Sequence, residues 1–286
     1  MENTKKELKI DIDAVILSKS PKLAKYTPKF IVNWLKKIIH QTELNQILEN
    51  NRDTQGAEFA KKTLEYLNVK CNIIYKNKEA LSKDKRYIFV SNHPLGGLDG
   101  LILISEMGRD FNEIKFVVND LLMHIEPLKP VFVPVNKHGK MGKEYGMLIN
   151  DAYSSNAQIL YFPSGLCSRL IKGEIKDLEW KKNFIKQAKK YNRDIVPVHF
   201  SGRNSNFFYR LAKFRKFLGI KFNFEMIFLP DEMIKQKNTT FDAIIGEPIP
   251  ISTIDNSRTL DEWCSYIREK SYSLKNENGT NNTTNR

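Results

Sequence analysis

A histidine and an aspartate flank a proline and a glycine pair near the middle of the chain. His93 and Asp99 are separated by a segment that contains Gly96 and Gly97. Because proline and paired glycines favour a tight turn, the Asp99 carboxylate can fold back to the His93 imidazole. A carboxylate on one ring nitrogen fixes the tautomer and makes the other nitrogen a base for a hydroxyl proton. The pattern indicates a general base, although a solvated histidine beside an aspartate that caps a helix near Gly100 also explains it.

The elements around this pair alternate between strand and helix patterns. An apolar run at residues 87–91 directly precedes Asn92 and His93 and is typical of a buried strand. The alternation predicts an α/β fold with a mostly parallel central sheet flanked by helices. Strand patterns also cover residues 69–75, 114–118, 131–135, 158–162, 194–200, 222–229 and 240–246, and helix patterns cover 101–107, 142–153, 180–191 and 260–272.

The chain divides into three parts by pattern. Residues 1–67 are predicted to form an N-terminal helical extension that contacts a membrane, loosely ordered over residues 1–20. Residues 68–274 are expected to form the α/β domain, and residues 275–286, rich in Asn and Thr, a disordered tail. Neither a transmembrane helix nor a signal peptide is expected, because no apolar run is long enough and the first residues are polar.

The charge balance points to anionic partners. The 286 residues include 46 Lys and Arg against 33 Asp and Glu, a net charge of +13. This excess suits a phospholipid surface, a phosphorylated substrate or nucleic acid. No nucleic-acid-binding module is recognisable, so nucleic acid is not an expected partner. The three cysteines lack the spacing of a disulfide framework or a zinc site, which fits a reducing cytoplasm.

Two stretches combine basic and aromatic side chains without any acid. The first, residues 18–42, places Tyr26, Phe30 and Trp34 at four-residue intervals among lysines. It is typical of a helix lying in the plane of an anionic membrane, or of a helix packed on the domain with a solvated lysine face. The second, residues 203–224, suits anionic lipid or the acidic surface of a carrier protein.

Other strand patterns end in residues that could bind a substrate. Asn136 and Lys137 follow the strand at 131–135, and Ser164, Gly165 and Arg169 follow the strand at 158–162. Because the carboxyl ends of parallel strands share one edge of a sheet, we expect these residues to converge near the histidine.

The order of these segments resembles the glycerolipid acyltransferase superfamily, which includes glycerol-phosphate and lysophosphatidate acyltransferases. Its Asn-His-x4-Asp motif corresponds to residues 92–99, its basic middle block to 131–137, its Phe-Pro-Glu-Gly turn to 162–165 and its Val-Pro strand to 195–198. Two departures stand out. Five residues rather than four separate the histidine from the aspartate, which the extra glycine can absorb, and Ser164 replaces the glutamate.

The resemblance implies an O-acyltransferase that moves a fatty acyl group from acyl-CoA or acyl-carrier protein to the hydroxyl of a lysolipid, with no cofactor and no metal. His93 would be the base and Asp99 its partner. The amino-acid sequence of these motifs is most similar to a bacterial branch labelled haemolysin or lysophospholipid acyltransferase. That branch is associated with aminolipids such as ornithine and glycine lipids. Such an enzyme would lie peripherally on the inner face of the cytoplasmic membrane. The implied substrate-binding residues are Asn92, Asn136, Lys137, Ser164, Gly165 and Arg169.

Two other functions stay open at this point. A lipid hydrolase would use Ser164 or Ser168 as its nucleophile, but the G-x-S-x-G elbow is missing from this region. A non-catalytic basic protein that binds membranes is the second alternative. The scattered spacing of His93, Asp99 and His199 is not typical of a metal site.

Overall fold

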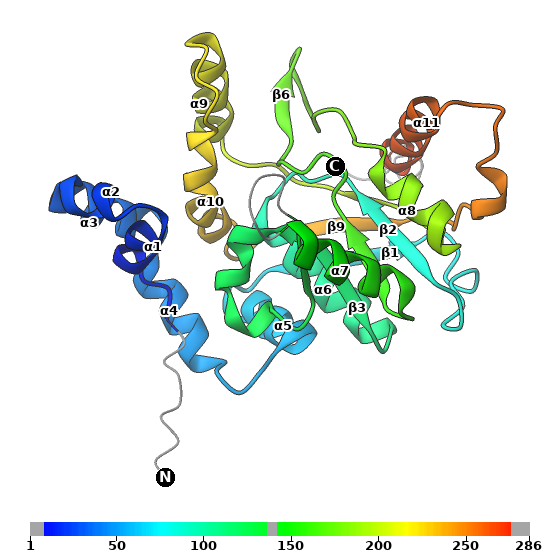
Figure 1. The fold of residues 1–286 in the computed structure, drawn as a ribbon, viewed down its shortest axis with the longest axis horizontal. Coiled ribbons are helices and arrows are strands. Elements are labelled where there is room, and N and C mark those ends of the chain that lie inside the picture. The colour runs from blue at the N-terminus through cyan, green and yellow to red at the C-terminus, as the bar shows by residue number, and fades with distance from the viewer. Residues whose placement is uncertain (1–8, 136–141, 276–286) are drawn as a thin grey trace, which may run out of the picture.

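A seven-stranded sheet forms the centre of the structure (Figure 1), a computed structural model that describes residues 9–135 and 142–275. The strand order is β1-β9-β8-β2-β5-β3-β4. All neighbouring strands are parallel except β8 and β9, so the predicted mostly parallel α/β fold is confirmed. The strands of this sheet are β1 (Lys70–Tyr75), β2 (Tyr87–Ser91), β3 (Ile114–Asn119), β4 (Phe132–Val135), β5 (Gln158–Tyr161), β8 (Asp194–Phe200) and β9 (Thr240–Ile245).

Strand β2 lies in the middle of the sheet and is buried on both faces. Tyr87 and Phe89 point into the core on one face, and Ile88 and Val90 point into the core on the other. This is the alternation that the pleat of a strand imposes. With both faces packed, the end of β2 is a rigid support for the residues that follow it. The covering helices are α5 (Gly56–Tyr66) and α6 (Gly97–Asp110) on the first face, and α7 (Gly142–Ser154), α8 (Asn183–Tyr191) and α11 (Leu260–Ser273) on the second.

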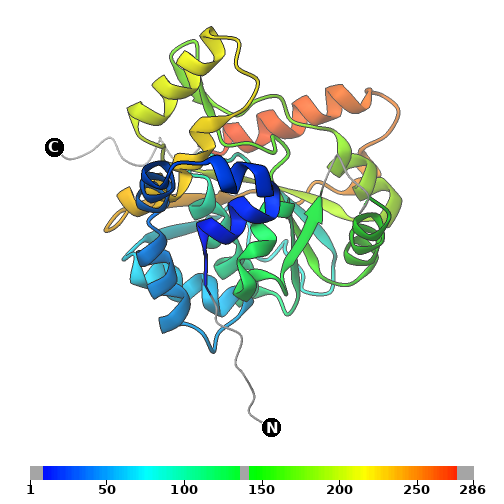
Figure 2. The same ribbon diagram turned by 60° about the vertical axis from the view of Figure 1, so that its left-hand side comes forward.

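The predicted N-terminal helices are present and stand beside this unit (Figures 1 and 2). They contact its later part, because His40 Nε2 lies 2.8 Å from Asp231 Oδ1 and the Trp34 ring meets Phe228 edge-on. Within the described residues, no helix is long and apolar enough to span a bilayer. The helices are α1 (Ile12–Lys19), α2 (Pro21–Tyr26), α3 (Lys29–Ile38) and α4 (Gln41–Asn50).

The expectation of loose order over residues 1–20 is wrong for α1. The Asp11 side chain accepts a hydrogen bond from the Asp13 backbone N–H and so caps the helix. The preceding chain is tied down as well, since the Ile10 backbone N–H donates to the Asn45 side chain at 2.7 Å. The predicted disordered tail lies almost wholly outside the described residues.

Three segments after β5 differ from the predictions. The segment 222–229 is not a strand but a 3₁₀ helix, η3 (Phe224–Phe228), which runs into α10 (Leu229–Lys235). A short apolar run does not by itself distinguish a strand from a buried helix. The sequence also did not predict α9 (Asn206–Phe217), which Ser205 caps by accepting from the Phe208 backbone N–H, or a two-stranded hairpin of β6 (Arg169–Ile171) and β7 (Glu174–Lys176).

Candidate active site

His93 and Asp99 meet at the carboxyl end of β2. His93 Nδ1 and Asp99 Oδ1 are 3.0 Å apart, and the Asp99 side chain is fully buried while that of His93 is 15% exposed. Asp99 Oδ2 accepts a second hydrogen bond from the Leu95 backbone N–H at 2.9 Å. Asp99 is not the cap of the helix, because α6 begins at Gly97; it lies in the first turn, where the helix dipole favours its charge.

Gly96 makes the turn between them possible. Its φ of 74° lies in the left-handed region, and a Cβ there would come within 2.9 Å of the Leu229 side chain. Only glycine adopts this conformation without strain. The additional residue between the histidine and the aspartate is therefore accommodated by a backbone that other residues would resist.

The His93 ring is held in one orientation by two neighbours. It stacks on Phe162 with a centroid distance of 4.1 Å and an interplanar angle of 19°. Phe162 directly follows β5, which pairs with β2, so the predicted convergence of these two strand ends is confirmed. With Asp99 accepting the Nδ1 proton, Nε2 becomes the basic nitrogen.

The pKa of His93 is raised well above its ordinary value. Burial of the ring opposes its protonation, but the negative charge of Asp99, together with Cys167 and the hydrogen bond to Asp99, outweighs burial. Cys167 is fully buried and belongs to the turn after β5. Sequence analysis assigns no role to this cysteine, although it lies between the candidate residues Ser164 and Arg169.

The raised pKa of His93 sets the expected pH dependence of the reaction. A general base works in its neutral form, so kcat/KM should increase as the pH rises through this pKa and level off above it. Asp99→Asn removes the charge that raises the pKa but leaves burial in place. We expect the rising limb to move to lower pH and the plateau to fall. If the rising limbs of the two pH profiles, for the wild type and Asp99→Asn, coincide, the pairing of His93 with Asp99 is contradicted.

Asp177 connects the chain at His93 to the turn that follows β5 at Ser168. Sequence analysis did not identify it. Its buried carboxylate accepts from the His93 backbone N–H at 3.1 Å, the Ser168 hydroxyl at 2.6 Å and the Trp180 indole at 2.9 Å. The Ser168 backbone N–H in turn donates to the His93 carbonyl at 2.7 Å. Asp177 thus fixes the main chain on which the base is mounted. It lies outside every motif, so no spacing pattern could have identified it.

Two of the implied substrate-binding residues are engaged within the protein. The Asn92 side chain is buried and exchanges two hydrogen bonds with the Phe200 backbone, at 2.9 and 2.7 Å, joining the ends of β2 and β8. The Arg169 guanidinium is buried and binds Glu225 at 2.9 Å and the Cys167 carbonyl at 2.6 Å. These contacts favour structural roles for both. Asn136 and Lys137 lie outside the described residues.

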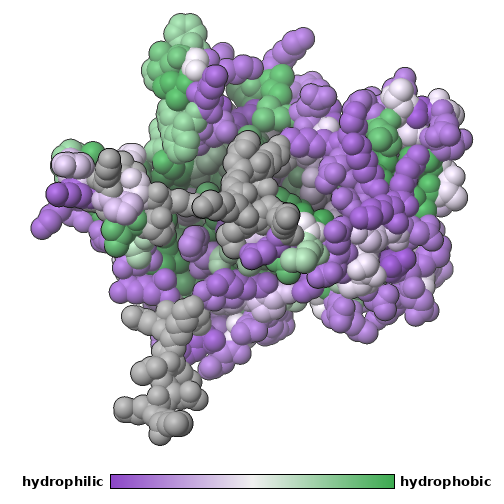
Figure 3. All heavy atoms as spheres, in the orientation of Figure 1, coloured by the Kyte–Doolittle hydropathy of each residue, from purple (hydrophilic) through white to green (hydrophobic). Residues whose placement is uncertain are grey.

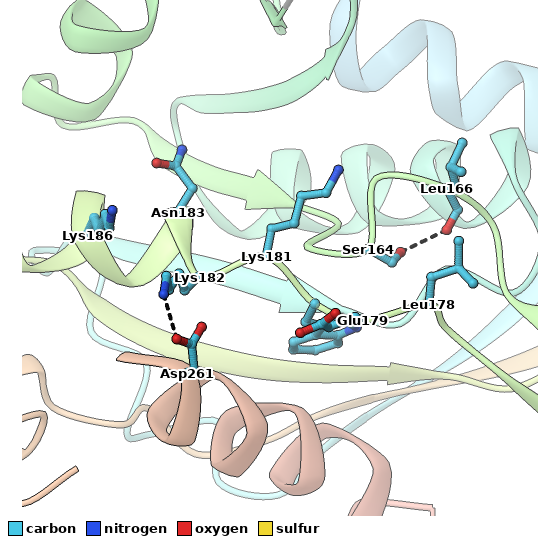
Figure 4. Close-up of a pocket in the computed structure, with 10 residues that line it drawn as sticks. Ser164, Leu166, Leu178, Glu179, Lys181, Lys182, Asn183, Lys186 and Asp261 are labelled. Atoms are coloured by element: carbon cyan, nitrogen blue, oxygen red, sulfur yellow. Dashed lines mark hydrogen bonds and ion pairs between the residues drawn. The ribbon is translucent and has the colours of Figure 1, made fainter. Parts of the chain in front are cut away.

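Ser164 lies at the edge of a surface hollow of about 530 Å³ (Figure 4). The Ser164 hydroxyl donates to the Leu166 carbonyl at 2.8 Å, and Gly165 takes a φ of 65° at the turn. Across the hollow, Lys182 pairs with Asp261 at 2.6 Å. The remaining charged side chains of the lining are Lys181, Lys186 and Glu179.

The geometry does not favour a serine hydrolase. Ser168 donates its hydroxyl proton to Asp177 and Ser164 donates its own to a backbone carbonyl. A nucleophilic serine has to hydrogen-bond the histidine that takes its proton. Within the described residues neither hydroxyl has such a bond to the His93 ring.

Comparisons with known proteins identify the family. The Acyltransferase family model matches residues 14–280. The chain is 47% identical to a lyso-glycine lipid O-acyltransferase of Bacteroides thetaiotaomicron over 93% of this chain and 97% of that one. It is 43% identical to a lyso-glycine lipid O-acyltransferase of Phocaeicola vulgatus, covering 93% of this chain and 95% of that one. The crystal structure of the 1-acyl-sn-glycerophosphate acyltransferase PlsC from Thermotoga maritima aligns with a TM-score of 0.43 and 15% identity over 87% of this chain and 97% of that one. The chain belongs to the acyltransferase family and is an O-acyltransferase.

Proposed function

We propose that this enzyme transfers a fatty acyl group from a thioester to the hydroxyl of a lyso-glycine lipid, with His93 as general base. The hydrogen bond between His93 and the fully buried Asp99 carries the mechanism. The likeness over most of the chain to two lyso-glycine lipid O-acyltransferases supports the acceptor.

In this mechanism the acceptor hydroxyl gives its proton to His93 Nε2 while its oxygen attacks the thioester carbonyl. The tetrahedral intermediate collapses with cleavage of the C–S bond, and the departing thiolate takes the proton from the imidazolium. Asp99 stabilises that imidazolium and holds the ring. The products are the O-acylated lipid and the free thiol of the donor carrier. Acyl-CoA and acyl-carrier protein are the two proposed donors.

The hollow beside Ser164 is the proposed site for the carboxylate of the acceptor. Lys181, Lys182 and Lys186 line it. Their three positive charges exceed the two negative charges of Glu179 and Asp261. A glutamate in place of Ser164, as in the family motif, would repel a carboxylate head group. The serine at this position therefore suits a carboxylate-bearing acceptor.

Substitutions at Ser164 test this assignment. Ser164→Ala should keep measurable activity, because the hydroxyl donates to a turn carbonyl and, within the described residues, does not bond the His93 ring. Ser164→Glu should raise the KM for the lyso-glycine lipid about fivefold or more, since a like charge facing the head group costs roughly 1 kcal/mol or more. The KM for the donor should change little. Steady-state kinetics with each substrate varied in turn measure both. A covalent acyl-Ser164 adduct would contradict direct transfer.

The decisive test of the function compares acceptors. The purified enzyme is incubated with an acyl-CoA and either lyso-glycine lipid or lysophosphatidate, and the products are identified by mass spectrometry. Acylation of the glycine lipid, and accumulation of its lyso form in cells that lack the gene, would support the proposal. Release of free fatty acid without an acylated acceptor would support the hydrolase instead.

We also propose that the enzyme binds an anionic membrane peripherally, on the cytoplasmic face, through α3. Phe30 and Trp34 are 72% and 51% exposed, as that contact requires. Replacing Lys29, Lys36 and Lys37 with Glu should weaken binding to anionic vesicles far more than binding to neutral ones, because lysines near a surface contribute about 1 kcal/mol each. Co-sedimentation measures this. Equal binding of the wild type and the variant would assign α3 to packing alone.

A further inference from the structure

The end of α9 and the neighbouring hairpin carry large apolar side chains that folding leaves uncovered (Figure 3). Phe217 is 85% exposed, Phe222 69% and Phe214 55%. Apolar side chains exposed singly are common, but a group of this size marks an interaction site. We call the group the apolar rim; it consists of Leu170 and Ile171 of β6 and of Phe214, Phe217, Leu218 and Phe222 at the end of α9 and in the loop after it.

A buried ion-pair triad holds the two parts of the rim together. Glu225 of η3 is fully buried, and its carboxylate accepts from Arg169 of β6 at 2.9 Å and from Arg215 of α9 at 2.8 Å. The helix and the hairpin accordingly project from the same end of the molecule (Figure 1). The rim is therefore presented as one rigid unit.

The charge around the rim is predominantly positive, and the exposed Glu174 of the hairpin pairs with Lys176. No acidic residue occurs between residues 203 and 224. Arg210, Lys213, Lys216 and Lys221 are exposed and form no ion pair within the described part of the chain. Lysines around projecting phenylalanines are the chemistry of an interfacial anchor, in which the cations attract anionic head groups and the rings enter the acyl boundary.

We propose that the apolar rim inserts into the surface of an anionic bilayer and is a second lipid contact, separate from α3. An acidic protein partner would satisfy the lysines but would leave the projecting Phe217 and Phe222 without a partner, whereas a bilayer accepts both. Hydrogen bonds also connect the rim to the chain around His93. Arg169 donates to the Cys167 carbonyl, and the backbone N–H of the adjoining Ser168 donates to the His93 carbonyl. The proposed function supplies the reason for such a contact, since both lipids would reside in that bilayer.

The test compares two double variants on vesicles of phosphatidylcholine and phosphatidylglycerol in a 3:1 ratio. Phe217→Ser with Phe222→Ser should lower the vesicle partition coefficient about tenfold or more, because two large apolar side chains no longer enter the boundary. Met147→Ser with Leu148→Ser, which removes two exposed apolar side chains from α7, should leave the coefficient unchanged. With short-chain donor and acceptor in solution, the rim variant should turn over at the wild-type rate.

Three outcomes separate this inference from the proposed function. An unchanged partition coefficient for the rim variant would overturn the inference. Normal vesicle binding with lost affinity for acyl-carrier protein would also overturn it and make the rim a protein-docking surface. If the rim variant loses vesicle binding but the wild-type enzyme does not acylate lyso-glycine lipid, the lipid contact is supported and the proposed function is refuted.

Discussion

His93→Ala should lower the rate of acyl transfer by about 10²–10⁴-fold, the range for loss of a positioned general base. The ring contacts Asp99 and Phe162 at the end of β2, and its side chain is not part of the core on either face of the sheet. The fold should therefore persist. Single-turnover transfer from a labelled acyl thioester measures the chemical step directly.

His124→Ala is the matched control for this prediction. His124 is an exposed histidine in the 3₁₀ helix after β3, and the mechanism gives it no part. Its variant should transfer acyl groups at the wild-type rate. Circular dichroism and thermal unfolding should show that both variants are folded. A His93→Ala enzyme that is folded and as fast as the control would remove the histidine from the mechanism.

The sequence was most informative where a single chain segment determined the geometry. Strands at 87–91 and 194–200 were predicted with their observed bounds, because short, mainly apolar runs between polar segments leave few alternatives. The contact between His93 and Asp99 was predicted as well, since the turn that joins them is local.

What the sequence did not reveal depends on partners that are distant in the chain. Arg169 is predicted to be a substrate ligand because it follows a strand end at the edge of the sheet shared with His93. Its partner Glu225 is 56 positions away, in a segment predicted as a strand, so nothing in the local pattern indicated burial. Asp177 was missed because its contact with the catalytic histidine spans 84 positions, although its partners Ser168 and Trp180 are near it in the chain.

Glu225→Gln should destabilise the fold by about 3–5 kcal/mol, the usual cost of removing one partner from a buried ion pair. The amide keeps the volume of the side chain but leaves the guanidinium groups of Arg169 and Arg215 without a counter-charge in a buried site. The free energy of unfolding, measured in urea, gives the size of the effect.

Glu65→Ala is the matched control for that substitution, because it removes a carboxylate from an exposed pair. The Lys61 and Glu65 side chains are 60% and 62% exposed, so we expect a change below about 1 kcal/mol. Since Arg169 also binds the Cys167 carbonyl beside His93, Glu225→Gln should lower acyl transfer at temperatures where the protein is still folded. A loss of stability as small as that of the control would mean that solvent reaches the triad, and the apolar rim would then have no rigid base.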